Sequence, residues 1–221
     1  MRKLLVDTCA IVWLATGDRK LSQFARDAMR DAELLCFSSI SIWEIARLVK
    51  TGDLEIPVSP QRLAKAALIA GAFDERFYAV VPNQTGGGGC PLLKRNYGEN
   101  VEALMRNFPH WFCSDFGKYA GREKEMPFDS HLLMACVAPR KLLVEGFDDP
   151  FYDTEGEFEA LKAASSVWTF LGRSGLPRST WPVAYDVSAI GSDIGYVRRS
   201  ERHGLSAHDW TWIMDFASDK W

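Results

Sequence analysis

Short apolar runs alternate with segments of helical periodicity over the first fifty residues. The pattern predicts strands at 2–6 and 34–39 and helices at about 21–29 and 41–51. Ser22 stands where it can cap the first helix, and Gly52 stands where the second helix should end. Strands and helices in this β-α-β-α order are typical of an α/β fold with a parallel sheet.

The alternation continues through the rest of the chain. Further strands are predicted at 77–82, 139–146 and 192–197, and helices at about 61–72, 97–107, 158–168 and 208–217. The glycine run Gly86–Gly89 is too short for a spacer and is interpreted as a loop. We therefore expect an α/β fold, mainly a parallel sheet with helices on both faces.

The composition is that of an ordinary globular protein, with 47% hydrophobic and 25% charged residues. A formal charge of −3 gives no basic footprint for general nucleic-acid binding, although it leaves a metal-dependent nuclease open. Five scattered cysteines without a C-x-x-C pair indicate buried thiols rather than disulfides or a zinc site. Asp7 interrupts the apolar start, which makes a poor signal peptide and is too short to span a membrane. We expect a soluble, cytoplasmic chain.

Two acids in the N-terminal part stand out, Asp7 at the end of the first strand and Glu44 in the helix predicted at 41–51. Carboxylates at the carboxyl ends of parallel strands meet at one edge of the sheet, where such folds bind ligands. Oxygen ligands there suit Mg²⁺ or Mn²⁺, which can activate water for phosphodiester cleavage. The alternative is that Asp7 caps a turn and Glu44 is solvated.

The blocks "LLVDTCAIVWLATGDRKLS" and "SSISIWEIARLVKTGDLEIP" resemble the first half of PIN-domain ribonucleases of the toxin–antitoxin type. The resemblance covers about residues 1–65, and it implies RNA as substrate and an antitoxin protein as partner. It also implies that Asp7 and Glu44 are the first two acids of a metal-binding quartet. The second half that carries the other two acids does not follow, so we expect weak, poorly positioned binding of Mg²⁺ or Mn²⁺.

The remainder of the chain, residues 66–221, resembles the C-terminal part of bacterial glucuronoyl esterases, which are α/β-hydrolases. The matching blocks, in order, are "ALIAGAFDERF", "VVPNQTGGGG", "KRNYGEN", "HWFCSDF", "MPFDSHLLMACVAPRKLLVEG", "DTEGEF" and "DIGYVRRSERHGLSAHDW". We therefore interpret the chain as a chimera, with a truncated PIN-like segment at 1–65 and a truncated esterase-like segment at 66–221.

The esterase resemblance assigns His203 as the catalytic base, which would take the proton of a serine hydroxyl and return it to the leaving alcohol. Some members place the triad acid where this chain has Gln84, which carries no charge. Others place it after the next-to-last strand, and Asp149 fits that position, with Asp148 and Asp153 as neighbouring alternatives.

The nucleophile is where this chain departs from the family, whose nucleophile elbow reads G-x-S-R-x-G-K. The aligned segment here is "SPQRLAK", so that Gln61 takes the serine position. Arg62 and Lys65 match the basic residues that assist the oxyanion and the sugar, and Trp111 matches an aromatic of the sugar site. Asp129 and His131 match a polar pair to which we assign structural hydrogen bonds.

Three interpretations of function remain. The first is a glucuronoyl esterase relative that lacks its nucleophile, needs no cofactor, and is inactive or only binds uronic-acid-containing carbohydrate. The second is a Mg²⁺- or Mn²⁺-dependent PIN-type ribonuclease with an incomplete acidic site. The third is a gene-fusion product without catalytic function.

Overall fold

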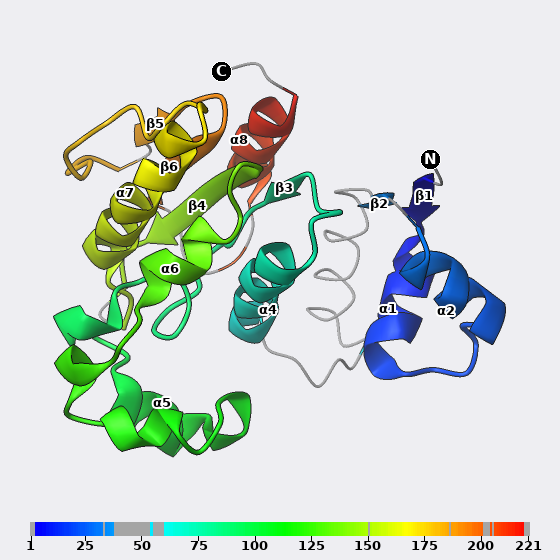
Figure 1. Ribbon diagram of the computed structural model, residues 1–221, viewed down its shortest axis with the longest axis horizontal. Helices are drawn as coiled ribbons and strands as arrows, with labels where there is room; N and C mark the ends of the chain where they lie inside the picture. Colours follow the sequence, from blue (N-terminus) through cyan, green and yellow to red (C-terminus); the bar gives the residue numbers. More distant parts are fainter. Residues whose placement is uncertain are drawn as a thin grey trace. The chain divides into compact units, whose positions relative to one another are not determined.

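The computed structural model describes residues 3–32, 34–37, 54, 60–149, 151–185, 187–200, 204 and 206–218. The chain divides into two compact units, Met1–Ser59 and Pro60–Trp221. Figure 1 traces both along the sequence. Among the described residues no helix is long and apolar enough to cross a membrane.

The first unit pairs β1 (Lys3–Val6) in parallel with β2 (Leu34–Phe37). Helix α1 (Thr8–Thr16) and helix α2 (Gln23–Arg30) follow β1 in the chain. A small core forms from Val6, Leu21 and Met29, with Ile11 and Trp13 packed against it. The side chain of Ser22 accepts a hydrogen bond from the backbone of Ala25, which confirms the predicted cap of α2. The helix predicted at 41–51 lies outside the described residues.

The second unit contains a four-stranded sheet in the order β3-β4-β6-β5. Its strands are β3 (Ala79–Val80), β4 (Lys141–Phe147), β5 (Val187–Ile190) and β6 (Ile194–Arg199). Strands β3, β4 and β6 run parallel to one another, and β5 pairs antiparallel with β6. The sheet is therefore mostly parallel, as predicted.

Helices cover both faces of this sheet. Helices α4 (Pro60–Phe73), α6 (Ser130–Ala135) and α7 (Thr154–Phe170) pack on one face through a core that includes Leu68, Met134, Leu142, Val144 and Trp168. Helix α8 (Ala207–Ala217) packs on the other face, where Trp212 meets Leu143 of β4. Successive residues of β4 thus alternate between two cores, which is why the whole strand is buried.

A smaller cluster lies between β3 and α6 in the chain. It is built from helix α5 (Val101–Asn107) and the single-turn helices η1 (Leu93–Arg95), η2 (Pro109–Trp111), η3 (Phe116–Tyr119) and η4 (Glu123–Glu125). Leu104 and Met126 belong to its buried core. The helix predicted at 97–107 begins only at Val101, because Gly98 has a φ of +61° and the side chain of Asn100 caps the helix.

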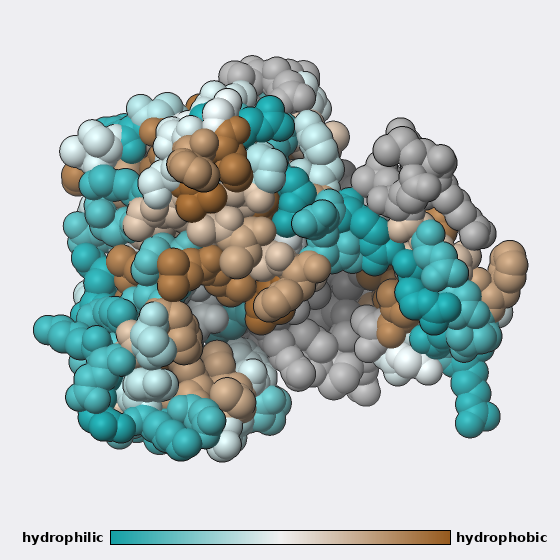
Figure 2. Space-filling view, in the orientation of Figure 1, coloured by the Kyte–Doolittle hydropathy of each residue, from teal (hydrophilic) through white to brown (hydrophobic). Residues whose placement is uncertain are grey.

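The cysteine prediction was wrong in part. Of the four cysteines whose side chains the structure describes, Cys90 is buried, whereas Cys9, Cys113 and Cys136 are exposed free thiols. Burial of a thiol depends on which face of an element it occupies, and these short helical segments do not reveal that face. Apolar residues also reach the surface in Figure 2 over α4 and α6, where Ile69, Phe73 and Leu132 are exposed.

Candidate functional site

The carboxyl ends of three neighbouring strands meet at one edge of the larger sheet. Strands β3, β4 and β6 are parallel neighbours, and Phe147 at the end of β4 pairs with Arg199 at the end of β6. Asp149 follows β4 by two residues, and position 203 follows β6 by four. Such an edge is where open α/β sheets bind ligands. His203 itself lies outside the described residues, as does its distance to Gln61.

Lys65 lies beside an acid and an aromatic ring. Its side chain is only 8% exposed, and its Nζ lies 3.9 Å from Glu99 Oε2 and 4.8 Å from the centre of the Trp111 ring. Within the described part of the chain, this Nζ donates no hydrogen bond. The structure therefore brings two residues of the predicted sugar site together, Lys65 and Trp111, and adds Glu99. Gln61 and Arg62 lie in the first turn of α4, but their side chains are outside the described residues.

Burial sets the electrostatics of this cluster. It lowers the pKa of Lys65 to about 8, against the attraction of Glu99, which raises it. Burial also raises the pKa of Glu99, while Lys65 and a hydrogen bond from the backbone of Gly87 oppose that rise. Lys65 is therefore almost without solvent and Glu99 is only partly solvated, and the two charges lie 3.9 Å apart, beyond hydrogen-bond distance.

The glycine loop is shaped around Glu99. Gly86 has a φ of +60°, and a Cβ there would lie 2.4 Å from Glu99 Oε2. At Gly87 a Cβ would lie 2.0 Å from the Glu99 carbonyl, and the Gly87 amide donates to Glu99 Oε2 at 3.1 Å. Only glycine permits this close approach of two backbones. The loop thus fixes the position of the Glu99 carboxylate.

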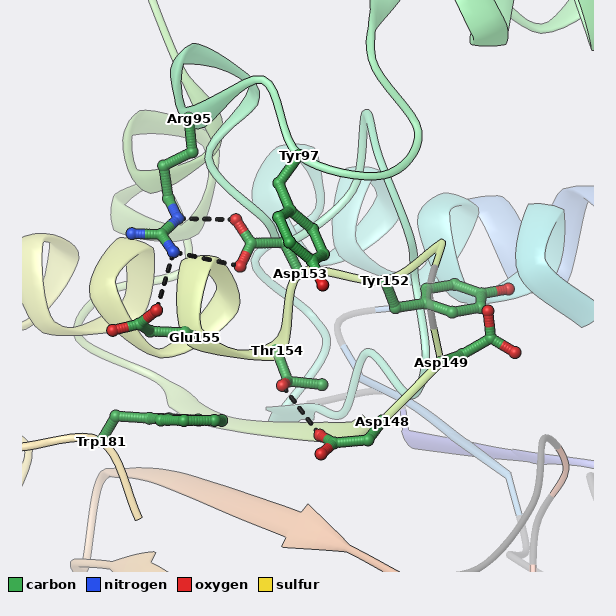
Figure 3. Close-up of a pocket in the computed structure, with 9 residues that line it drawn as sticks. All are labelled: Arg95, Tyr97, Asp148, Asp149, Tyr152, Asp153, Thr154, Glu155 and Trp181. Carbon is green, nitrogen blue, oxygen red and sulfur yellow. Dashed lines mark hydrogen bonds and ion pairs between the residues drawn. The ribbon is translucent and has the colours of Figure 1, made fainter. Parts of the chain in front are cut away.

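A cavity of about 400 Å³ opens at the end of β4 and the start of α7 (Figure 3). It is lined by Arg95, Tyr97, Asp148, Asp149, Tyr152, Asp153, Thr154, Glu155 and Trp181. Figure 3 shows Arg95 directed at Asp153 and Glu155, and the Arg95 Nε to Asp153 Oδ2 distance is 2.6 Å. Tyr152 and Asp149 lie together on the opposite side of the cavity from Arg95.

The three neighbouring aspartates differ in how they are used. Asp148 pairs with Arg198 and accepts hydrogen bonds from the hydroxyls of Tyr185 and Thr154. Asp153 caps α7 and pairs with Arg95. Asp149 accepts a bond from the backbone of Phe151 at 2.9 Å and is half-buried. Of the three, Asp149 is the one that no arginine engages within the described residues, which favours it for the predicted role.

Sequence reasoning missed two buried acids below this edge, Glu145 of β4 and Glu157 of α7, both at most 1% exposed. Burial raises the pKa of Glu145 to about 8, and the nearby charge of Asp209 adds to the rise. Asn83 donates to Glu145 Oε2, and Thr85 donates to Glu157 Oε1 at 3.5 Å. Burial likewise raises the pKa of Glu157. An acid inside an apolar strand, as in "KLLVEGF", is the feature that could have identified Glu145.

The predicted structural role of Asp129 is confirmed. Its carboxylate accepts hydrogen bonds from the backbone amides of Leu93, Lys94 and Ser130 and so joins η1 to the start of α6. His131 follows in α6, half-buried, and its Nδ1 has no hydrogen-bond partner among the residues described.

The N-terminal acids are only partly visible. Asp7 is exposed, and its carboxylate caps α1 by accepting a hydrogen bond from the amide of Cys9 at 3.2 Å. Glu44 lies outside the described residues. In the part of the chain that the structure describes, no three His, Cys, Asp or Glu side chains are grouped so as to hold a metal ion. Of the two predicted acids, only Asp7 lies among the described residues, and its carboxylate is already used to cap α1, so we derive no metal-dependent step from it.

Comparisons with known families match both parts of the chain. The family model described as "Glucuronyl esterase, fungi" matches residues 59–172, just over half of the chain, and the PIN-domain model matches residues 4–81. The two matched ranges overlap at 59–81.

Curated relatives point the same way. "Carbohydrate esterase MZ0003", from an unknown prokaryotic organism, is 40% identical over 157 residues, which are 71% of this chain and 36% of that protein. A 4-O-methyl-glucuronoyl methylesterase from Cerrena unicolor is 30% identical over 151 residues, 59% of this chain and 31% of that protein. The chain thus spans about a third of the length of the curated relatives it matches.

Solved structures agree with these relatives. A promiscuous CE15 esterase from a marine bacterial metagenome has a TM-score of 0.68 and 31% identity over 90% of this chain and 53% of that one. A glucuronoyl esterase from Solibacter usitatus has a TM-score of 0.67 and 35% identity over 82% of this chain and 48% of that one.

Proposed function

Because the chain belongs to the glucuronyl esterase family, we propose that its Pro60–Trp221 unit binds uronic-acid-containing carbohydrate and hydrolyses esters negligibly. The observation that carries the proposal is the cluster of Lys65, Glu99 and Trp111 combined with glutamine at position 61.

The cluster has the chemistry of a sugar site. A buried ammonium without a hydrogen bond, beside a half-buried carboxylate, is costly unless a ligand completes the hydrogen bonding of both groups. A sugar hydroxyl can satisfy both groups, because it can accept a hydrogen bond from Lys65 and donate one to Glu99. Trp111, stacked on Phe108 at 4.1 Å between ring centres, supplies an apolar surface for the face of a sugar ring.

The start of α4 supports binding without turnover. Gln61 is the second residue of this helix, where the family resemblance places the nucleophile. The side-chain amide of glutamine has no hydroxyl to attack an ester and form the acyl intermediate, and loss of a triad serine costs about 10⁶ in rate. Ala64 replaces the glycine of the elbow, and Pro60 has no amide proton. The esterase-like unit requires no cofactor for either role.

Two experiments on the unaltered chain test the proposal. Calorimetry measures the binding of methyl glucuronate, and a fluorophosphonate probe detects any reactive serine. We expect saturable sugar binding that Lys65→Met weakens, no hydrolysis and no labelled serine. Lys118→Met, at a side chain 68% exposed, is the matched control. Stoichiometric labelling of Ser59 or Ser192, or hydrolysis above background, would contradict the proposal.

Restoring the elbow separates chemistry from binding. Gln61→Ser alone should add little activity, whereas Ser59→Gly, Gln61→Ser and Ala64→Gly together should add more. Nucleophile, turn and oxyanion donors act as a unit, so their effects are not additive.

The PIN-domain match over residues 4–81 favours a second candidate, a ribonuclease that uses Mg²⁺ or Mn²⁺ at Asp7 and Glu44 with an incomplete acid set. Asp7 follows β1 as such a site requires, yet its carboxylate caps α1. A fusion product without catalysis is the third candidate, and absence of both sugar and metal binding would favour it.

A further inference from the structure

Gln84 adopts a backbone conformation that residues other than glycine rarely take. Its φ is +55°, and its side chain is only 2% exposed. Conformations of this kind persist where surrounding contacts impose them, and they are enriched at functional sites. The contacts of Gln84 therefore indicate what the conformation serves.

Both edges of the Gln84 side-chain amide face one residue of another loop. Its Nε2 donates to the carbonyl of Gly204 at 2.8 Å, and its Oε1 accepts from the amide of Gly204 at 2.8 Å. The Gln84 backbone amide donates to the carbonyl of Glu145 in β4 at 2.9 Å. The side chain thus pairs with Gly204 as a neighbouring strand would, and ties it to the sheet.

The same carbonyl is held from a second side. Arg199 Nη1 donates to the Gly204 carbonyl at 2.7 Å, and Arg199 Nε lies 2.7 Å from Asp209 Oδ1. Asp209 also accepts from the backbone of Ser206, which completes the capping box of α8. Position 204 is therefore fixed between the end of β6 and the start of α8.

We propose that Gln84 is a positioning residue: it fixes Gly204, and through Gly204 it acts on His203, which directly precedes Gly204 in the chain. The importance of His203 rests on the proposed function, but the contact between Gln84 and Gly204 does not. The position requires a group that both donates and accepts, and an ionised carboxylate only accepts. A glutamate here would face the Gly204 carbonyl without a proton between them. The triad acid of this chain is consequently sought after β4, at Asp149, rather than at position 84.

Hydrogen exchange of the Gly204 amide, followed by NMR on the full chain, tests the contact. Gln84→Met keeps the size and removes both bonds, so exchange at Gly204 should become at least about tenfold faster. Ser165→Ala is the control, because it removes a buried hydroxyl that accepts from Leu176 at 2.7 Å elsewhere in the unit. Unchanged exchange in Gln84→Met would overturn the proposal.

Gln84→Glu distinguishes hydrogen bonding from mere packing. Protonation of the introduced carboxyl at acidic pH supplies the missing donor, so protection of Gly204 should increase as the pH falls. A glutamate that protects Gly204 equally at every pH contradicts a need for a donor.

The imidazole titration of His203, assigned with His203→Gln, tests positioning without any substrate. Its midpoint should move by more than about 0.2 pH units in Gln84→Met and stay fixed in Ser165→Ala. A midpoint unchanged in Gln84→Met while Gly204 exchanges faster would reduce Gln84 to a purely structural contact. Failure of sugar binding or of the restored elbow leaves these results untouched and counts against the proposed function alone.

Discussion

The ammonium of Lys65 lies 4.8 Å from the centre of the Trp111 ring, buried to the same extent as residues of the hydrophobic core. Few lysines are placed this way without a counter-group at full hydrogen-bond distance. The arrangement makes the cluster sensitive to pH and to each of its three members.

Binding of a glucuronate sugar should weaken as the pH rises through about 8, because Lys65 then loses the proton that it offers to a sugar hydroxyl. Trp111→Ala should weaken binding by about tenfold through loss of the ring surface. Both effects are measurable by calorimetry between pH 6 and 9.5. In Lys65→Met the pH dependence should vanish, and a dependence that persists in that variant would exclude Lys65 as its origin.

The stability of the unit should fall as the pH rises from about 4.5 to about 8 through Glu145. Its pKa in the folded state, about 8, lies above the ordinary value of 4.5, so the folded protein holds a proton that the unfolded chain releases. The stabilisation is complete below pH 4.5 and is lost by pH 8. Glu145→Gln should remove on the order of 3 kcal/mol of the difference between pH 5 and pH 8 in urea unfolding. If the free energy of unfolding depends on pH equally in the unaltered chain and in Glu145→Gln, ionisation of Glu145 does not destabilise the fold.

The ion pair of Arg199 and Asp209 should be strongly coupled, because each side chain is only 1% exposed. Asp209→Leu removes this ion-pair partner from a buried guanidinium and should cost about 3–5 kcal/mol. Adding Arg199→Met to Asp209→Leu should recover only part of the lost stability, since the carbonyl of Gly204 then loses a hydrogen-bond donor.

The matched control for that pair is Glu125→Gln. On the surface, Arg122 pairs with Glu125, and their side chains are 57% and 61% exposed, respectively. Loss of this pair should cost less than about 0.5 kcal/mol. Urea unfolding of the unaltered chain, Asp209→Leu, Arg199→Met, the double variant and Glu125→Gln compares the two pairs. Additive effects of the two core substitutions would indicate that Arg199 and Asp209 do not interact.

Metal binding at the N-terminal unit should be in the millimolar range or absent. Mg²⁺ requires near-ideal octahedral placement of its ligands, and the carboxylate of Asp7 is already used in capping α1. Calorimetry with Mg²⁺ and Mn²⁺ measures this directly. Micromolar binding that Asp7→Ala abolishes would instead support the ribonuclease alternative.

Elements with a clear apolar pattern could be predicted from the sequence, and contacts between distant segments could not. The strand "KLLVEGF" and the helix that contains Phe158 and Trp168 lie where their patterns placed them. Helix α1 was not predicted, because "TCAIVWLAT" is almost uniformly apolar and shows no helical face. Strand β5 was missed as well, since four residues are too few to show alternation.

The candidate site was predictable only where a motif marks it. Lys65 and Trp111 were selected through their alignment to the family, and the structure adds that they touch. Glu99 and Gly204 could not be chosen, because their importance arises from contacts 34 and 120 positions away, with Lys65 and Gln84. Sequence periodicity describes what each segment buries, but it does not say which segments meet.

Strand β3 stands at one end of the strand order, and its ladder with β4 covers two residues, Ala79 and Val80, before an isolated bridge between Asn83 and Glu145. Pro82 follows directly and has no amide proton to offer. An edge strand this short offers few backbone groups for pairing with another polypeptide. A proline beside it interrupts the hydrogen-bond ladder that a growing fibril needs. Self-association through β3 is thereby discouraged by the chain itself.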